Sequence, residues 1–128
     1  MKFSKWPQLI LILWCISILI VIYYSLLPQV EFPVDFWSAD KAYHCAAYGW
    51  LAVLPMTGFS ARRLASSAAL SMIFLGILLE VGQHYLPGRS FSLLDITANT
   101  LGVILGIFLG NCLRSRLNGM KIYLVEGE

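Results

Sequence analysis

The chain has few charged residues: Asp, Glu, Lys and Arg make up only 12% of its 128 residues, against about 25% in a soluble globular domain. Hydrophobic residues make up 59%. A soluble helical protein of this composition would leave most of its apolar surface in contact with water, so the composition favours a membrane protein. The net charge of +2 is also too small and too dispersed for a nucleic-acid-binding surface, and no nucleic-acid partner is expected.

Cysteine is scarce as well. The three cysteines fall in different parts of the chain, at Cys15, Cys45 and Cys112, so a disulfide framework is not expected. Internal repeats, low-complexity linkers and room for a separate soluble domain are all lacking. Residues 1–128 are therefore predicted to form a single transmembrane domain.

The scarce charges separate four long uncharged stretches. About 20 apolar residues are enough to cross the ~30 Å hydrocarbon core of a bilayer as a helix, and each stretch reaches or approaches that length. We therefore predict an all-α integral membrane bundle. Its four transmembrane helices are expected at about residues 7–27, 41–60, 63–86 and 92–113.

The distribution of basic residues predicts the orientation of this bundle. Two bases fall on one side of the membrane, Lys41 and Arg89, and seven fall on the side of both termini, namely Lys2, Lys5, Arg62, Arg63, Arg114, Arg116 and Lys121. By the positive-inside rule both termini are expected in the cytoplasm. The first helix is expected to be an uncleaved anchor, because its apolar core is longer than that of a signal peptide and no Ala-x-Ala site follows.

Polar residues recur near the outer ends of helices 2, 3 and 4. The 1.5 Å rise per residue places His44, Glu80 and Asn99 about 6, 9 and 10 Å inside their helix ends. A polar or charged side chain at such a depth costs about 2.5–3.5 kcal/mol unless partners or water meet it. We therefore predict an outward-facing polar pocket that is formed by helices 2, 3 and 4. Its candidate ligand-binding residues are Asp40, Lys41, Tyr48, Gln83, Arg89, Asp95 and Asn99.

Several of these residues also have purely structural interpretations. Ser92-x-x-Asp95 has the spacing of a capping box at the start of helix 4, and Arg89 can serve only to neutralise a neighbouring carboxylate. Helix 4 also carries small residues at regular spacing, a pattern that allows close helix packing and could mediate a homo-oligomer through helix 4. These packing residues are Gly102, Gly106 and Gly110.

Taken together, the polar motifs resemble the VanZ-like family. They are Asp40-Lys41-x-x-His44 with Tyr48, Glu80-x-x-Gln83, Pro87-Gly88-Arg89-Ser90 and Asp95-x-x-x-Asn99-x-x-Gly102-x-x-x-Gly106, in the family's order over a core of about residues 40–110. Cys45 is a departure, because family members often have a bulkier residue after the histidine. The resemblance implies a small multi-pass protein of the bacterial cytoplasmic membrane. The family is named for a member associated with resistance to the glycopeptide teicoplanin.

The first functional hypothesis is that the pocket binds or handles a membrane lipid, a lipid-linked cell-envelope intermediate or another amphiphile. Lys41 and Arg89 would hold an anionic head group, Arg89 through bidentate contacts, while Glu80 and Asp95 would orient these bases. The apolar walls would take an acyl or isoprenoid tail.

A second hypothesis assigns the same residues to acid–base hydrolysis or transfer on a phosphorylated lipid. His44 would be the general base, and Glu80 the acid, so whether the protein is an enzyme stays open. His44, Glu80, Asp95 and Asn99 are acceptable metal ligands, yet no HExxH-like motif is present, and we expect neither a metal nor a cofactor. Proton-coupled transport and a structural subunit are the remaining alternatives.

Overall fold

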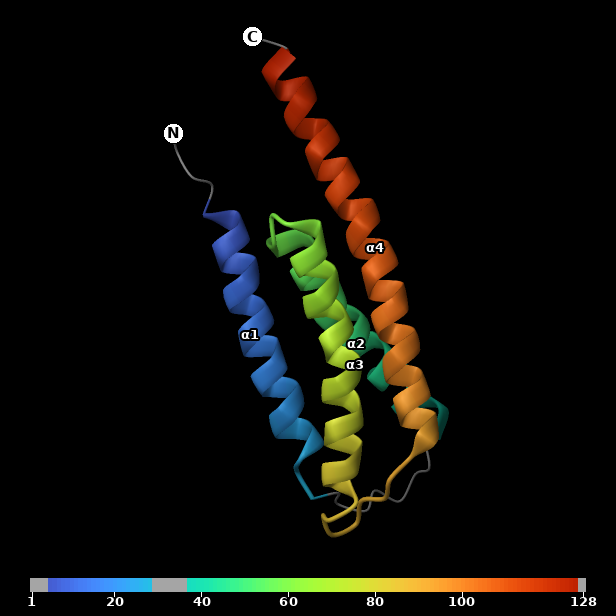
Figure 1. Cartoon of the computed structure of the whole chain (residues 1–128). Coiled ribbons are helices and arrows are strands. Elements are labelled where there is room, and N and C mark those ends of the chain that lie inside the picture. Colours follow the sequence, from blue (N-terminus) through green and yellow to red (C-terminus); the bar gives the residue numbers. More distant parts are fainter. Residues whose placement is uncertain (1–4, 29–36, 127–128) are drawn as a thin grey trace.

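The computed structural model describes residues 5–28 and 37–126. Within these ranges the chain is all-helical, as predicted, and contains α1 (Trp6–Ser25), α2 (Trp37–Gly58), α3 (Arg62–Gln83) and α4 (Leu93–Glu126). Successive helices run in opposite directions, so the two termini lie at the same end of the bundle (Figure 1). We call the opposite end, where α2 and α4 begin and α3 ends, the pocket end.

The helix boundaries differ from the predicted ones mainly at the start of α2, the end of α3 and the end of α4. α2 begins at Trp37, before the predicted residue 41. α3 ends at Gln83, before the predicted residue 86, because the next backbone bonds are of the shorter i to i+3 type: Tyr85 N–H donates to Gly82 O and Leu86 N–H to Gln83 O. Gly88 then adopts a φ of 72°, which glycine accepts without a steric penalty.

α4 is much longer than predicted and continues to Glu126 over 34 residues. The prediction of an end near residue 113 followed the apolar stretch, which stops before Arg114. A change from apolar to basic residues ends the segment suited to lipid but does not end a helix, because Arg and Leu are good helix formers and no proline follows.

Three of the helices are long and apolar enough to cross a membrane: Trp6–Ser25, Arg62–Gln83 and Leu93–Gly119. The fourth predicted span, α2, has 22 residues but carries Asp40, Lys41 and His44 in its first turns, and its crossing of the membrane stays a prediction. α2 supplies much of the buried core, including Tyr48, Leu51 and Met56. α2 contacts each of the other three helices.

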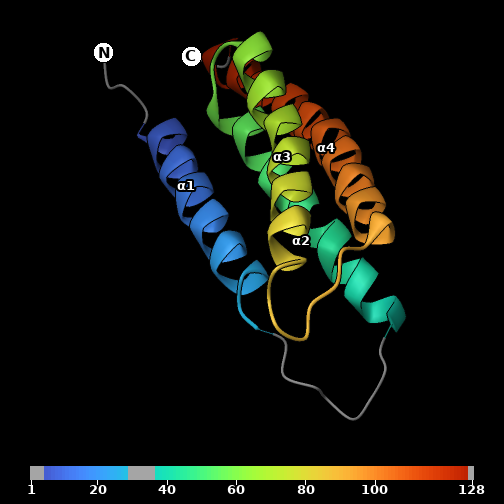
Figure 2. The same cartoon turned by 60° about the horizontal axis from the view of Figure 1, so that its bottom comes forward.

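The helices pack as a central pair with α1 at one side. The contact between α2 and α4 is the most extensive, and α3 contacts both. α1 touches α2 and, to a small extent, α3, whereas among the described residues it makes no contact with α4. Figure 2 shows the same arrangement from a second direction, with α1 on the flank of the bundle. Large apolar side chains on the outer faces of α1, α3 and α4 are exposed, as expected for surfaces that face lipid.

The glycine stripe of α4 faces α2 within the same chain. A Cβ atom added to Gly102 would collide with the carbonyl oxygen of Cys45, and one added to Gly106 would collide with that of Gly49. At Gly110, the added atom would lie 2.5 Å from Met56 Cβ. This close approach occupies the glycine face, so a homo-oligomer through α4 would have to use a different face of the helix.

We predict that Gly106→Ala destabilises the bundle while Gly119→Ala, in the same helix, does not. The added methyl group of the first variant has no room against α2, which costs about 1–3 kcal/mol of overpacking, whereas nothing lies within 4 Å of the corresponding atom at Gly119. Unfolding of the purified proteins by sodium dodecyl sulfate in mixed micelles measures the stability of both variants. Equal stability of the two variants would contradict the close packing of α2 and α4.

A proline in α2 creates a link to α1. Pro55 lies inside α2 and has no N–H, so the carbonyl of Leu51, four residues earlier, lacks its intrahelical donor. The indole N–H of Trp14 on α1 donates to this oxygen at 2.9 Å. A second bond joins the same helices, from Trp50 Nε1 to Ser17 Oγ at 3.1 Å. Pro55 does not end α2, because a neighbouring helix supplies the missing donor.

A double-mutant cycle between Trp14→Phe and Pro55→Ala tests this link. Trp14→Phe leaves the Leu51 oxygen without a donor and should cost about 1 kcal/mol. In the Pro55→Ala background the new backbone N–H satisfies that oxygen, so the same substitution should cost clearly less. The unfolding assay in mixed micelles measures the coupling. Identical costs in both backgrounds would show that the indole bond does not compensate for the proline.

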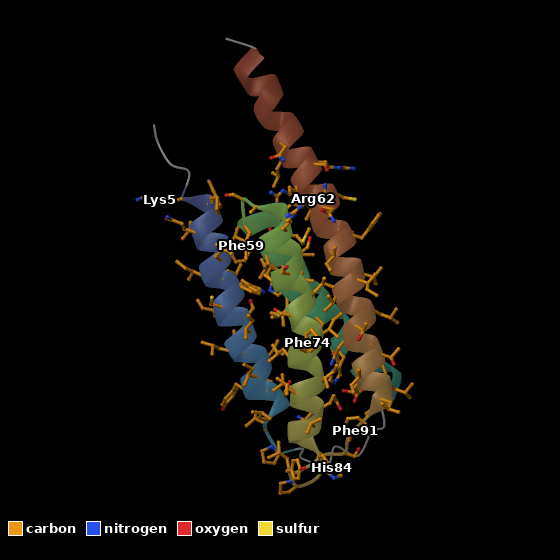
Figure 3. All side chains as sticks on the ribbon, in the orientation of Figure 1. Lys5, Phe59, Arg62, Phe74, His84 and Phe91 are labelled. Carbon is orange, nitrogen blue, oxygen red and sulfur yellow. The ribbon has the colours of Figure 1, made fainter. Side chains whose placement is uncertain are left out.

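The end of the bundle near the termini is basic. Lys5 and Arg62 lie at this end, while His84 and Phe91 lie at the pocket end (Figure 3). Arg114 on α4 donates to the carbonyl oxygens of Met56, Phe59 and Ser60, where α2 ends. A cation is favourable there, because the last carbonyls of a helix carry a partial negative charge. Lys2, which was assigned to the same side, lies outside the described residues.

Candidate functional site

A polar cavity of about 220 Å³ opens at the pocket end. It lies between the start of α2, the end of α3, the connection from α3 to α4 and the first turn of α4. Six of the residues singled out in the sequence line it, together with Ser90 and Ser92. The six are Asp40, Lys41, His44, Gln83, Arg89 and Asp95.

An apolar groove of about 190 Å³ adjoins this cavity. Val21 and Tyr24 of α1 form one wall, and Tyr43, Ala47 and Tyr48 of α2 form the other. The groove and the cavity share four lining residues, which are Asp40, His44, Gln83 and Arg89. The predicted pocket involved only helices 2 to 4, so the part played by α1 is a correction. Polar and apolar lining residues thus lie next to each other at this end of the bundle.

Lys41 joins the two helices that pack at the glycine stripe. Its Nζ atom contacts Asp95 Oδ1 on α4 and lies 3.2 Å from Asp40 Oδ2 on its own helix. The Asp95 side chain is mostly buried, and the Asp40 side chain is 53% exposed. The charge of Lys41 is therefore matched inside the protein, which makes it a poorer partner for an external anion than the sequence suggested.

His44 is held by Asn99, which is buried on the facing side of α4. His44 Nδ1 lies 3.0 Å from Asn99 Oδ1, and because a carbonyl oxygen only accepts, Nδ1 carries the hydrogen. The other ring nitrogen, Nε2, lies 3.7 Å from Asp40 Oδ1. Asn99 thus orients the ring so that Nε2 faces the cavity side.

Glu80 has a different position from the one expected. Its side chain is fully buried and lines neither the cavity nor the groove. Its Oε2 accepts the backbone N–H of Ser92 at 3.1 Å. The carboxylate therefore holds the start of α4 in place and does not orient Arg89 or Lys41 among the described contacts.

The predicted capping box at Ser92 is formed in one direction only. Ser92 Oγ accepts the backbone N–H of Asp95 at 3.2 Å, as the spacing indicates. The reciprocal bond would run from Ser92 N–H to the Asp95 carboxylate, but Glu80 takes that place and Asp95 turns to Lys41. The exchange satisfies both carboxylates and connects α3, α4 and α2.

Gln83 and Arg89 connect the site to the end of α1. Gln83 Nε2 donates to Ser25 O at 3.0 Å. Arg89 Nε donates to Leu27 O at 3.1 Å, and its Nη2 donates to Tyr24 O at 3.3 Å. A guanidinium has five N–H groups, so Arg89 retains donors for a ligand beyond these two bonds.

Tyr48 is buried at the bottom of the groove, where it packs beside Gly76 of α3. It belongs to the core cluster of α2 with Leu51 and Met56, and its position fits packing as well as ligand contact. Sequence reasoning missed the α1 residues of the groove. The polar end of that helix, Tyr23-Tyr24-Ser25, was the available signal, since it lies at the same level as the polar starts of α2 and α4.

Three side chains at the site have the composition of a metal-binding group. Asp40, His44 and Asp95 offer ligand atoms that all lie within 4.8 Å of one another. The set differs from the one considered from the sequence, because Glu80 and Asn99 face other partners. Lys41 contacts both aspartates and supplies a cation there already. That no metal is bound stays a prediction.

The position of Glu80 predicts that Glu80→Ala and Glu80→Gln behave differently. Alanine leaves the Ser92 N–H without an acceptor, which should lower the free energy of local opening at the start of α4 by about 1–3 kcal/mol. Glutamine keeps a carbonyl oxygen that accepts the Ser92 N–H, so Glu80→Gln should preserve most of the free energy of local opening. Hydrogen exchange of peptides that contain Ser92 measures the effect. Equally fast exchange in both variants would show that the charge, and not the cap, is required.

Comparison with known proteins agrees with the resemblance of the polar motifs. A comparison with curated proteins and one with solved structures each found no match. The family model VanZ/LLP1 matches residues 3–114, which includes α1 as well as the motif-bearing helices. Because this match covers most of the chain, the protein belongs to the VanZ/LLP1 family.

Proposed function

We propose that the protein binds, at the outer face of the membrane, a lipid whose phosphate-bearing head enters the polar cavity and whose chain lies in the apolar groove. The observation that carries the proposal is that the polar cavity and the apolar groove are neighbours with four lining residues in common, namely Asp40, His44, Gln83 and Arg89. Ligand sites of this kind combine apolar walls with a few well-placed polar groups. An amphiphile matches both parts at once.

Arg89 is the residue best suited to hold the phosphate. Its guanidinium lines both spaces, and its contacts to Tyr24 O and Leu27 O fix its position while leaving further donors. Ser90 and Ser92, from the same α3–α4 connection, also line the cavity. Lys41 has a smaller part than the sequence suggested, because its charge is matched by Asp95 and Asp40.

The proposed orientation follows from charge. Lys5, Arg62, Arg63, Arg114 and Arg116 belong to the end of the bundle opposite the cavity. By the positive-inside rule that end faces the cytoplasm, which directs the cavity to the outer leaflet of the bacterial cytoplasmic membrane. Lipid-linked cell-envelope intermediates with a phosphate and a long isoprenoid chain are ligands of this chemistry. Binding such a lipid would connect this chain with the teicoplanin resistance for which the family is named.

Hydrolysis or transfer by His44 and Glu80 is less well supported. A general acid and a general base must both reach the same substrate. His44 lines the cavity and the groove, but Glu80 lines neither and accepts the Ser92 N–H. Binding without turnover is therefore the proposal that the positions of the side chains favour.

Two neighbouring alanines provide a matched test. Ala47 lines the groove, whereas Ala46 is exposed on α2 and lines neither space. Ala47→Phe should fill the groove and weaken binding of undecaprenyl phosphate or phosphatidylglycerol to the delipidated protein by about tenfold or more. Ala46→Phe should leave binding unchanged. Native mass spectrometry of the protein titrated with each lipid measures the affinities.

Arg89→Gln should weaken binding of the same lipids by about tenfold or more, because the substitution removes charge-assisted hydrogen bonds to the phosphate. Arg116→Gln, at the basic end, is the control and should have no effect. If Ala47→Phe and Arg89→Gln bind both lipids as the wild type does, the proposed site is wrong.

A further inference from the structure

The polar cavity has two walls of opposite charge. One wall is the α3–α4 connection, from which Arg89, Ser90 and Ser92 line the cavity and Arg89 supplies a positive charge. The other wall holds Asp40 and Asp95 with Lys41 between them, so its formal charge is 1 − 2 = −1. A head group with a phosphate alone would match only the first wall.

The acidic wall gathers two carboxylates and an imidazole in one place. His44 Nε2 lies 3.7 Å from Asp40 Oδ1. Asp40, His44 and Asp95 each offer a ligand atom, and these atoms all lie within 4.8 Å of one another. A group with several N–H donors would contact the carboxylate oxygens of Asp40 and Asp95 together.

We infer that the head group bound by this site carries a primary amine next to its phosphate, as in a phosphoethanolamine group. This inference rests on the proposed lipid-binding function and specifies its ligand. The ammonium group has three N–H donors for the carboxylate oxygens of Asp40 and Asp95, and its charge of +1 is opposite to the net formal charge of these two carboxylates with Lys41. The phosphate faces Arg89, so each wall meets a charge of opposite sign.

A divalent metal ion fits the same acceptors less well. The Nζ atom of Lys41 contacts both Asp40 and Asp95, so an ion with two positive charges would lie next to an ammonium group. Glu80, the nearest remaining carboxylate on α3, faces Ser92 and lines neither space, so its charge does not offset this repulsion from within the cavity. The ammonium of such a head group carries one positive charge, so its repulsion from Lys41 is smaller than that of a divalent ion, and the attached phosphate makes the head group neutral overall.

The test compares three lipids with identical acyl chains on the delipidated wild-type protein. Phosphatidylethanolamine has the amine, phosphatidylcholine has a cation without N–H donors, and phosphatidylglycerol has the phosphate without a cation. Native mass spectrometry should show phosphatidylethanolamine binding about tenfold tighter than the other two. Because this comparison uses only the wild-type protein, it does not depend on whether a variant folds.

Asp40→Asn should remove the preference by lowering the affinity for phosphatidylethanolamine to that for phosphatidylcholine. Glu80→Gln is the matched control: it also removes one negative charge, but from a side chain outside both spaces, and it should keep the preference.

The outcomes separate this inference from the function on which it rests. Equal affinity of the wild type for all three lipids would contradict the inferred amine but would leave the proposed lipid site intact. Absence of binding to any of them, together with none to undecaprenyl phosphate, overturns the lipid site itself. If Zn²⁺ displaces phosphatidylethanolamine, and if Asp40→Asn no longer binds Zn²⁺, these side chains bind a metal. That result would also contradict the inferred amine.

Discussion

The close approach of α2 and α4 is the constraint on which the site depends. Gly102 and Gly106 let the backbone of α4 come into contact with that of α2 at Cys45 and Gly49. Because both helices run in the same direction from the pocket end, this contact fixes their polar first turns beside each other (Figure 1). The contacts of Lys41 with Asp95 and of His44 with Asn99 are formed across this interface. With larger residues in the stripe, the helices would separate by more than these hydrogen bonds can span.

The need to satisfy polar groups in an apolar surrounding explains most of the remaining contacts. Among the described residues, no buried side-chain nitrogen or oxygen lacks a hydrogen-bond partner. Trp14 donates to the carbonyl that Pro55 leaves without a donor, and Arg114 covers the last carbonyls of α2. Gln83 and Arg89 do the same for the end of α1. A group left unpaired in lipid costs several kcal/mol, so these bonds help to position α1, which also packs Trp14, Ile18 and Val21 against the core.

The sequence predicted the depth of the polar residues better than their partners. Regular helical rise placed His44 and Asn99 at a common level, and the two side chains form a hydrogen bond. The spacing of Ser92 and Asp95 predicted a cap, of which one bond is present. Which carboxylate meets which donor could not be predicted in the same way. Glu80 and Asp95 exchange the partners expected of them, and that exchange depends on the angle at which α3 approaches α4.

Several properties therefore follow from the sequence alone: an all-helical chain, helices suited to a membrane, a basic end and a polar end, and membership of a family with an ordered set of polar motifs. They depend on composition and on local periodicity, which a single chain displays directly. Only the tertiary structure decided that Glu80 supports the start of α4, that Lys41 is neutralised within the protein, and that α1 forms a wall of the groove. These contacts join residues far apart in the chain, and their formation depends on the distances and angles at which the helices pack.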